Sequence, residues 1–178
     1  MNPCKKNCSC NICKQHDIQV SEVFKGIDIC KVRQEPTPSF GNFFQTAQVD
    51  LATNEPMPWN RQGETAGITL DPDTVTIRVT QAGSYNIDYY VNALFLEPLF
   101  ITVTTALFVN GAEVNPIQTR FGAINLTLNS LEFTPISGST IVSIPAGGTV
   151  QLRNVSPLNL VTAGNQMLAA SITLIKLN

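Results

Sequence analysis

The residues best suited to chemistry are five cysteines near the beginning of the chain. Cys4, Cys8, Cys10 and Cys13 are spaced C-x3-C-x-C-x2-C, Cys30 follows, and the rest of the chain has none. Thiols in such a run can bind a metal ion, form disulfides within one chain or form disulfides between chains. The spacing of the cysteines and the sequence around them favour the third interpretation over the first two.

A zinc site would need four thiolates arranged as a tetrahedron. Structural zinc sites usually pair two C-x(2–4)-C knuckles across a longer loop, whereas here four cysteines form one short run in which Cys8 and Cys10 flank a single residue. Disulfides within the run would need Cα atoms about 4.4–6.8 Å apart, which forces tight and strained loops. They would also stabilise little, because the entropic gain falls with loop length.

Disulfides between chains suit the run better. The number of cysteines is odd, which suggests a partner outside the chain in oxidising surroundings. The segment is polar and is followed by a proline-containing stretch, so it can reach a neighbouring copy. We therefore expect intermolecular disulfides from the following residues, with free thiols and metal binding as alternatives: Cys4, Cys8, Cys10, Cys13 and Cys30.

Residues for catalysis are scarce. The chain has one histidine, His16, so a Ser-His-Asp or Cys-His device would have to be built around it in the polar N-terminal segment. Most of the later Asp and Glu residues fall in turns or on polar strand faces, and no glycine-rich loop follows a strand and opens a helix. The sequence therefore predicts no enzyme, and it assigns no catalytic, cofactor-binding or metal-binding residue.

The distribution of charge divides the chain into two regions. Residues 1–35 hold six of the 11 Lys and Arg residues, and the chain as a whole is 13% charged with a net charge of −2, whereas typical domains are about 25% charged. We expect a Cys-rich N-terminal arm at 1–35, a proline-containing linker at 36–39 and one domain at 40–178. Without a basic stripe or a run of 18 apolar residues, we expect no nucleic-acid partner and no membrane span.

The expected domain alternates between apolar and polar residues with the period of a β-strand. TVTIRVT (74–80) places its two valines and its isoleucine on one face, and SYNIDYYVNAL (84–94) alternates in the same way. The apolar face of the second stretch consists of Tyr85, Ile87, Tyr89 and Val91. Asn110-Gly111 is a hairpin signal, and no helical period stands out. The chain is therefore expected to be all-β, as a β-sandwich or jelly roll.

The last strand, LAASITLIKLN (168–178), is apolar on both faces. Ile172 and Leu174 lie on one face, and Ile175 and Leu177 lie on the other. A strand of this kind is expected to be buried on both sides, which in a small domain suggests an interface between subunits.

Four stretches, taken in order, resemble a known family: DTVTIRVTQAGSYNIDYYVNA, TALFVNGAEV, SGSTIVSIPAGGTVQLRNVS and MLAASITLIKLN. They are similar to the tumour-necrosis-factor-like (TNF-like) jelly roll, which is shared with the globular heads of complement collagen-like proteins. More closely, they resemble the C-terminal domain of the collagen-like glycoprotein of the bacterial exosporium and its basal-layer relatives. The resemblance covers residues 40–178 and implies a homotrimer, with Ile172, Leu174, Ile175 and Leu177 as candidate trimer-interface residues.

The resemblance also implies a structural role on the spore surface. We expect a self-assembling subunit of an exosporium layer or of a fibre such as an endospore appendage, in which the arms join trimeric heads by disulfides. Such a protein would be made in the mother cell without a signal peptide, and its partners would be further copies of itself and an anchor or tip protein. The family's collagen stalk is absent, and the arm has no counterpart in the family.

The alternative is a binding module. In that case a trimeric head or adhesin would sit at the tip of a fibre, and its N-terminus would attach it to a stalk or basal layer. Electrophoresis without reductant would separate the two hypotheses, because a polymer gives a ladder of multimers and a tip module gives a single trimer.

Overall fold

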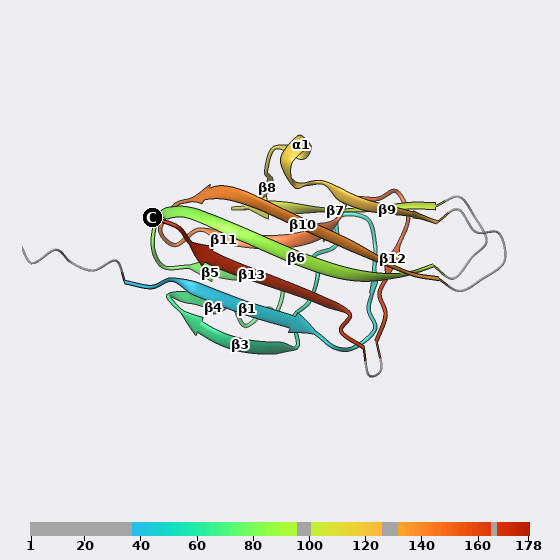
Figure 1. The fold of residues 1–178 in the computed structure, drawn as a ribbon, viewed down its shortest axis with the longest axis horizontal. Helices are drawn as coiled ribbons and strands as arrows, with labels where there is room; N and C mark the ends of the chain where they lie inside the picture. Colours follow the sequence, from blue (N-terminus) through green and yellow to red (C-terminus); the bar gives the residue numbers. More distant parts are fainter. Residues whose placement is uncertain (1–36, 96–100, 126–131, 165–166) are drawn as a thin grey trace, which may run out of the picture. The chain divides into compact units, whose positions relative to one another are not determined.

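The computed structural model describes residues 37–95, 101–125, 132–164 and 167–178. These residues form β-strands almost throughout, with one short helix, so the predicted all-β class is confirmed (Figure 1). The elements are β1 (Phe40–Gln45), β2 (Asp50–Leu51), β3 (Arg61–Ala66), β4 (Ile68–Leu70), β5 (Ile77–Val79), β6 (Gly83–Phe95), β7 (Ile101–Val109), β8 (Ala112–Glu113), α1 (Pro116–Thr119), β9 (Phe121–Asn125), β10 (Glu132–Ile144), β11 (Thr149–Asn154), β12 (Leu160–Val161) and β13 (Ala170–Lys176).

The strands form two main sheets. The first has the order β10-β6-β13-β1-β3, and its strands cross Figure 1 side by side from top to bottom. The second has the order β4-β5-β11-β7-β8, with β9 also paired to β7, and a small third sheet joins β12 to β2. All of the pairings are antiparallel, and β13, the last strand in the chain, lies between β6 and β1 in the middle of the first sheet.

The two main sheets enclose one hydrophobic core. The alternation expected in β6 is confirmed, because Tyr85, Ile87, Tyr89 and Val91 are all buried. The opposing sheet contributes buried side chains from β5, β7 and β11, and Trp59 lies in the same cluster. Burying a large apolar side chain stabilises a fold by about 1.5–3 kcal/mol relative to leaving it in water, so this core is the main source of stability among the described residues.

The strand expected at 74–80 is shorter than the sequence indicated. β5 covers only Ile77–Val79, and Thr76 is buried although it was assigned to the polar face. The reason lies at Asp73, whose carboxylate accepts hydrogen bonds from the backbone N–H groups of Val75 and Thr76 and from the Thr76 hydroxyl. These local bonds replace ladder bonds and fold the segment into a turn. The Thr76 hydroxyl is also the main cause that holds the pKa of Asp73 below its ordinary value.

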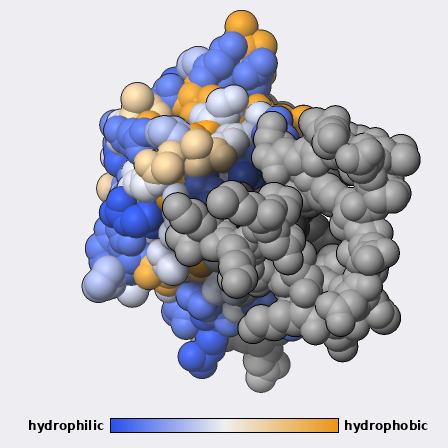
Figure 2. Space-filling model, turned by 90° about the vertical axis from the view of Figure 1, so that its left-hand side faces the viewer, coloured by the Kyte–Doolittle hydropathy of each residue, from blue (hydrophilic) through white to orange (hydrophobic). Residues whose placement is uncertain are grey.

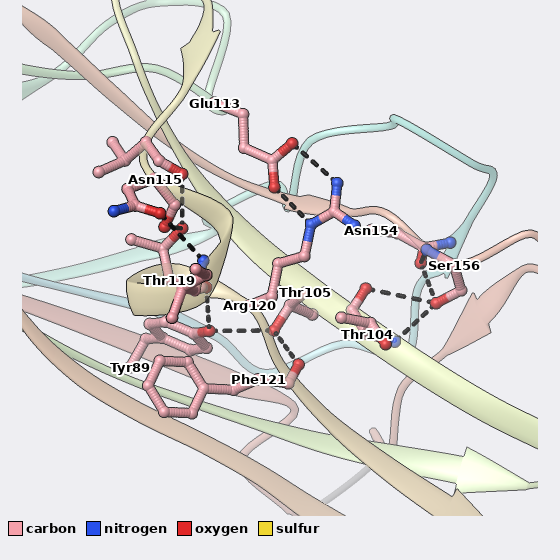
Figure 3. Close-up of polar contacts among 12 residues, drawn as sticks. Tyr89, Thr104, Thr105, Glu113, Asn115, Thr119, Arg120, Phe121, Asn154 and Ser156 are labelled. Atoms are coloured by element: carbon pink, nitrogen blue, oxygen red, sulfur yellow. Dashed lines mark hydrogen bonds and ion pairs between the residues drawn. The ribbon is translucent and has the colours of Figure 1, made fainter.

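Two polar side chains fix turns and strand ends. Asn110 and Gly111 have φ angles of 51° and 78°, as the hairpin signal requires, and the Asn110 side-chain oxygen accepts a bond of 2.9 Å from the Thr149 N–H. Asn154 is completely buried at the end of β11, and its side chain donates to the Leu51 carbonyl and accepts from Ser156 (Figure 3). The described part of the chain contains no helix with the length and apolar character that a membrane span requires.

Candidate assembly surface

The four interface residues expected in β13 lie on two different sides of the first sheet. Ile172 and Leu174 are completely buried in the core between the two sheets, so they are not at the surface of the chain. Ile175 and Leu177 point away from the core and are 45% and 54% exposed. The strand is apolar on both sides because one side faces the core and the other is an open apolar surface. The interface role of the outer pair stays a prediction.

Ile175 belongs to an apolar row that crosses four strands. The register pairs Ile141 of β10 with Asn86 of β6, Asn86 with Ile175, and Ile175 with Phe40 of β1. Side chains paired in this way have Cβ atoms about 4.5–5.5 Å apart on the same side of a sheet. Ile141 is 61% exposed and Phe40 is half-buried, so the row forms an apolar strip that one amide, Asn86, interrupts.

More apolar side chains lie on the same outward side. Tyr90 of β6 and Phe44 of β1 lie in one further row, and Phe133 of β10 pairs with Leu94 of β6 towards the other end of the sheet. Phe133 is 49% exposed, and the other three are half-buried. We call this outward side the sheet face, and its apolar members are Phe40, Phe44, Tyr90, Leu94, Phe133, Ile141, Ile175 and Leu177.

Between the apolar residues, the sheet face is polar but nearly uncharged. The row next to Ile175 consists of Ser139, Asp88, Thr173 and Asn42. Asp88 accepts a hydrogen bond from the Asn86 side chain, with an N–O distance of 2.5 Å. The side-chain oxygen of Asn42 is buried and has no hydrogen-bond partner among the described residues. This face can therefore be covered by another surface with the desolvation of very few charges.

The outward side of the second sheet has a different character. Phe108 of β7 points outward, but the guanidinium of Arg153 lies over its ring, 4.5 Å from the ring centre. Arg153 is held there by two hydrogen bonds to Gln151, and the exposed Arg78 of β5 forms an ion pair with Asp71. Two arginine side chains thus lie on the outward side of this sheet, which also exposes Ile124 of β9, and they make it less suited to self-association than the sheet face.

A short rigid loop stands beyond the β10 edge of the first sheet (Figure 1). Asn115 caps α1 by accepting a hydrogen bond from the Ile117 N–H, and Pro116 occupies the first turn. Ile117 is 93% exposed, and Figure 2 shows hydrophobic surface at the upper tip of the molecule, where α1 lies. No helix was expected from the sequence. The signal that could have revealed it is Asn115-Pro116, a cap followed by proline.

Polar contacts on both sides of α1 hold the loop in place (Figure 3). The Arg120 guanidinium donates to both carboxylate oxygens of Glu113 at 2.6 and 3.0 Å, and this bond is the main cause that holds the pKa of Glu113 below its ordinary value. Below α1, the Tyr89 hydroxyl donates to the Thr119 carbonyl oxygen at 3.2 Å and lies 3.3 Å from the Thr105 hydroxyl. Burial raises the pKa of Tyr89 to about 12, so the phenol stays neutral.

All five cysteines and His16 lie outside the described residues. The intermolecular disulfides expected from Cys4, Cys8, Cys10, Cys13 and Cys30 therefore stay a prediction, as does the division into arm, linker and domain. The described residues contain neither cysteine nor histidine, and no group of three metal-ligating side chains gathers among them.

Three solved structures share this fold. The TNF Eiger of S. frugiperda is 15% identical with a TM-score of 0.62, and the match covers 80% of this chain and 94% of that one. The globular domain of zebrafish complement 1qA is 13% identical with a TM-score of 0.58, covering 79% and 98%. Murine APRIL is 11% identical with a TM-score of 0.55, covering 79% and 99%. Identities this low show the fold alone, and they confirm the expected TNF-like jelly roll.

The sequence is also similar to a defined domain family. No curated protein sequence matches the chain, but the model of the BclA C-terminal domain matches residues 42–178. That domain is the C-terminal part of the collagen-like glycoprotein of the exosporium, so the match implies a structural role of the exosporium type on the spore surface, and it gives no support for catalysis. The chain belongs to the BclA C-terminal-domain family.

Proposed function

We propose that this protein is a structural subunit that assembles with copies of itself into a layer or fibre on the spore surface. The observation that carries the proposal is the sheet face, where apolar side chains from four adjacent strands are left open to solvent. Apolar side chains that gather on one exposed face often mark a surface that another molecule covers.

The domain would form a homotrimer through the sheet face. The TNF-like resemblance implies threefold assembly, and the apolar residues of the sheet face give such an assembly a hydrophobic driving force. Ile175 and Leu177 would lie in the interface, whereas Ile172 and Leu174 support the same strand from the core side. Of the four residues, only the outer pair would be shielded from water by a neighbouring subunit.

The arms would then join one trimer to the next by disulfides from Cys4, Cys8, Cys10, Cys13 and Cys30. The domain contains no cysteine and has a complete core of its own, so its folding is independent of thiol oxidation. The backbone just before β1 is already held by the first sheet, because the Ser39 carbonyl accepts a 2.8 Å hydrogen bond from the Lys176 N–H. Non-covalent contacts would give the assembly its register, and the sulfur bonds would resist its dissociation. An anchor or tip protein of the spore surface is a further expected partner.

Electron microscopy and electrophoresis of the purified full chain test this proposal. We expect filaments or sheets from the oxidised protein, and a ladder of detergent-resistant multimers that reductant collapses. A variant with all five cysteines changed to serine should keep its non-covalent trimer and lose the ladder. A ladder that persists in this variant, or a zinc ion bound within a single subunit by the thiols, would contradict the disulfide part of the proposal.

A second candidate function is a head at the tip of a fibre that binds another molecule. The observation that favours it is the loop around α1, which presents the 93%-exposed Ile117 on a fixed backbone outside the sheet face. An aliphatic side chain held out on a capped turn can enter a pocket of a partner. Immunogold labelling of spores separates the candidates, because a structural subunit is labelled along the whole fibre or layer and a tip module only at its ends.

A further inference from the structure

We propose that Asp88 and Arg61 form an ion pair between neighbouring copies of this chain when the sheet face is covered. This inference rests on the proposed self-association and adds to it the charged contact that fixes how two copies meet. The partner is a second copy of the chain.

The first observation is that Asp88 is isolated as a charge. Among the outward positions of the described parts of β10, β6, β13 and β1, it is the only charged residue. Its cross-strand neighbours are Ser139 and Thr173, and the one hydrogen-bond donor that it has in the described parts of the chain is the neutral amide of Asn86. Any surface that covers the sheet face must therefore desolvate this carboxylate, and a buried carboxylate is costly unless a cation or several donors meet it.

The second observation is that Arg61 is the one cationic side chain for which the described residues offer no partner. Four of the five cationic side chains from residue 37 onward already have one: Arg78 pairs with Asp71, Arg120 with Glu113, Arg153 with Gln151 and Phe108, and Lys176 with Gln81. Arg61 is exposed and makes no hydrogen bond or ion pair within the described residues. Arginine suits such a pair because its planar guanidinium can bind both oxygens of a carboxylate.

The third observation is that the two side chains share the sheet face and cannot meet within one molecule. Arg61 is the cross-strand partner of Phe44, and Phe44 points outward because its neighbour Phe43 is completely buried in the core. Asp88 lies on β6 and Arg61 on β3, so β13 and β1 stand between them. Three strand spacings amount to about 14 Å, well beyond the roughly 4 Å of an ion pair.

The apolar rows and the charged pair would have different roles in assembly. The apolar rows attract another copy but hardly determine how the two copies are oriented, because hydrophobic burial is non-directional. Asp88 and Arg61, at separate places on the same face, favour those arrangements in which the carboxylate of one copy meets the guanidinium of the next. Arrangements that bring two Asp88 residues together, or that leave both charges buried and unpaired, are disfavoured.

A charge-swap experiment on the full chain tests this pair. Sedimentation velocity in reductant, over a range of protein concentrations, reports the non-covalent association of the wild type and of D88R, R61D and the double variant D88R/R61D. Each single reversal should weaken association about tenfold or more, and the double variant should return to within about threefold of the wild type. The matched control is D50R, which places the same substitution on the exposed Asp50 of β2 and should leave association unchanged.

The outcomes separate this inference from the proposed function. Rescue in the double variant supports the ion pair. A double variant no better than the single variants, or single variants that associate like the wild type, overturns the pair and leaves self-association standing. A wild type that stays monomeric at all concentrations overturns both. Circular dichroism and thermal unfolding of each variant check that the fold is intact, and D88N with R61Q, which should each weaken association less than the reversals, provides a second pair that adds no new charge.

Discussion

Two isoleucines on the sheet face offer the most direct measurement of self-association. Ile141 and Ile175 are paired with the same residue, Asn86, and are 61% and 45% exposed. Complete burial of an isoleucine gives about 1.5–3 kcal/mol, so covering the exposed part gives about 0.9–1.8 kcal/mol for Ile141 and about 0.7–1.4 kcal/mol for Ile175. The double variant I141S/I175S should therefore weaken each interface by about 1.6–3.2 kcal/mol, which is roughly 15- to 200-fold in the association constant.

Sedimentation velocity of the full chain in reductant is the appropriate assay, because reductant removes any contribution from disulfides. The variant should need a protein concentration higher by at least that factor before it trimerises, because a closed trimer contains three such interfaces. As a monomer it should lose about 1.4–2.8 kcal/mol of stability, because the part of each isoleucine that is already buried is also removed, so association is compared at a temperature where both proteins are folded. The matched control is I117S, which removes the isoleucine that is 93% exposed on α1 and outside the sheet face. The reasoning is refuted if I117S dissociates the trimer and I141S/I175S does not.

Three further predictions concern the structure behind the loop. Y89F should destabilise the domain by about 1–2 kcal/mol, because the Thr119 carbonyl loses its donor, and it should remove a loss of stability at alkaline pH. That loss arises because the pKa of Tyr89 is raised from 10.0 to about 12 in the folded domain, so the unfolded chain ionises first as pH rises through 10; thermal unfolding and tyrosinate absorbance measure it. E113Q should lower the melting temperature most at neutral pH and not at all in acid. The pKa of Glu113 is lowered in the folded protein, so its ion pair contributes fully to stability above the ordinary carboxyl pKa. This contribution to stability is lost as pH falls through the lowered pKa. G138A should cost about 2 kcal/mol and lower the melting temperature by about 4–8 °C, since a Cβ there would lie 2.5 Å from the Phe121 ring and 2.8 Å from the Tyr89 ring; an unchanged melting temperature would contradict this.

Residue patterns predicted the fold where one side of a strand faces the core. The alternation of Tyr85, Ile87, Tyr89 and Val91 carried over directly because each second side chain of β6 enters the sandwich. Asn110-Gly111 was equally informative, since few other residues adopt two successive positive φ angles. The order of such strands was enough to reveal the resemblance to a jelly roll.

Residue patterns predicted the structure less well in two situations. One is where a side chain takes the hydrogen bonds that a strand would make, and the other is where contacting residues lie far apart in the sequence. Asp73 turned a predicted strand into a turn through three local hydrogen bonds that the apolar pattern did not reveal. The sheet face was found only in part, because Phe40, Asn86, Ile141 and Ile175 come from four strands far apart in the chain, and their alignment depends on register. Such an alignment depends on how the strands pair in the sheet, and no single segment of the sequence contains that information.

The position of β13 has a consequence for when assembly can begin. β1 and β6 are far apart in the chain and are joined only through β13, whose residues leave the ribosome after those of every other strand. Until Lys176 has been synthesised, Phe40 and Phe44 cannot align with Asn86 and Tyr90, and nascent chains therefore lack the aligned rows of the sheet face. The proposed self-association would then begin only after β13 has been made, and products truncated before β13 would be unable to join.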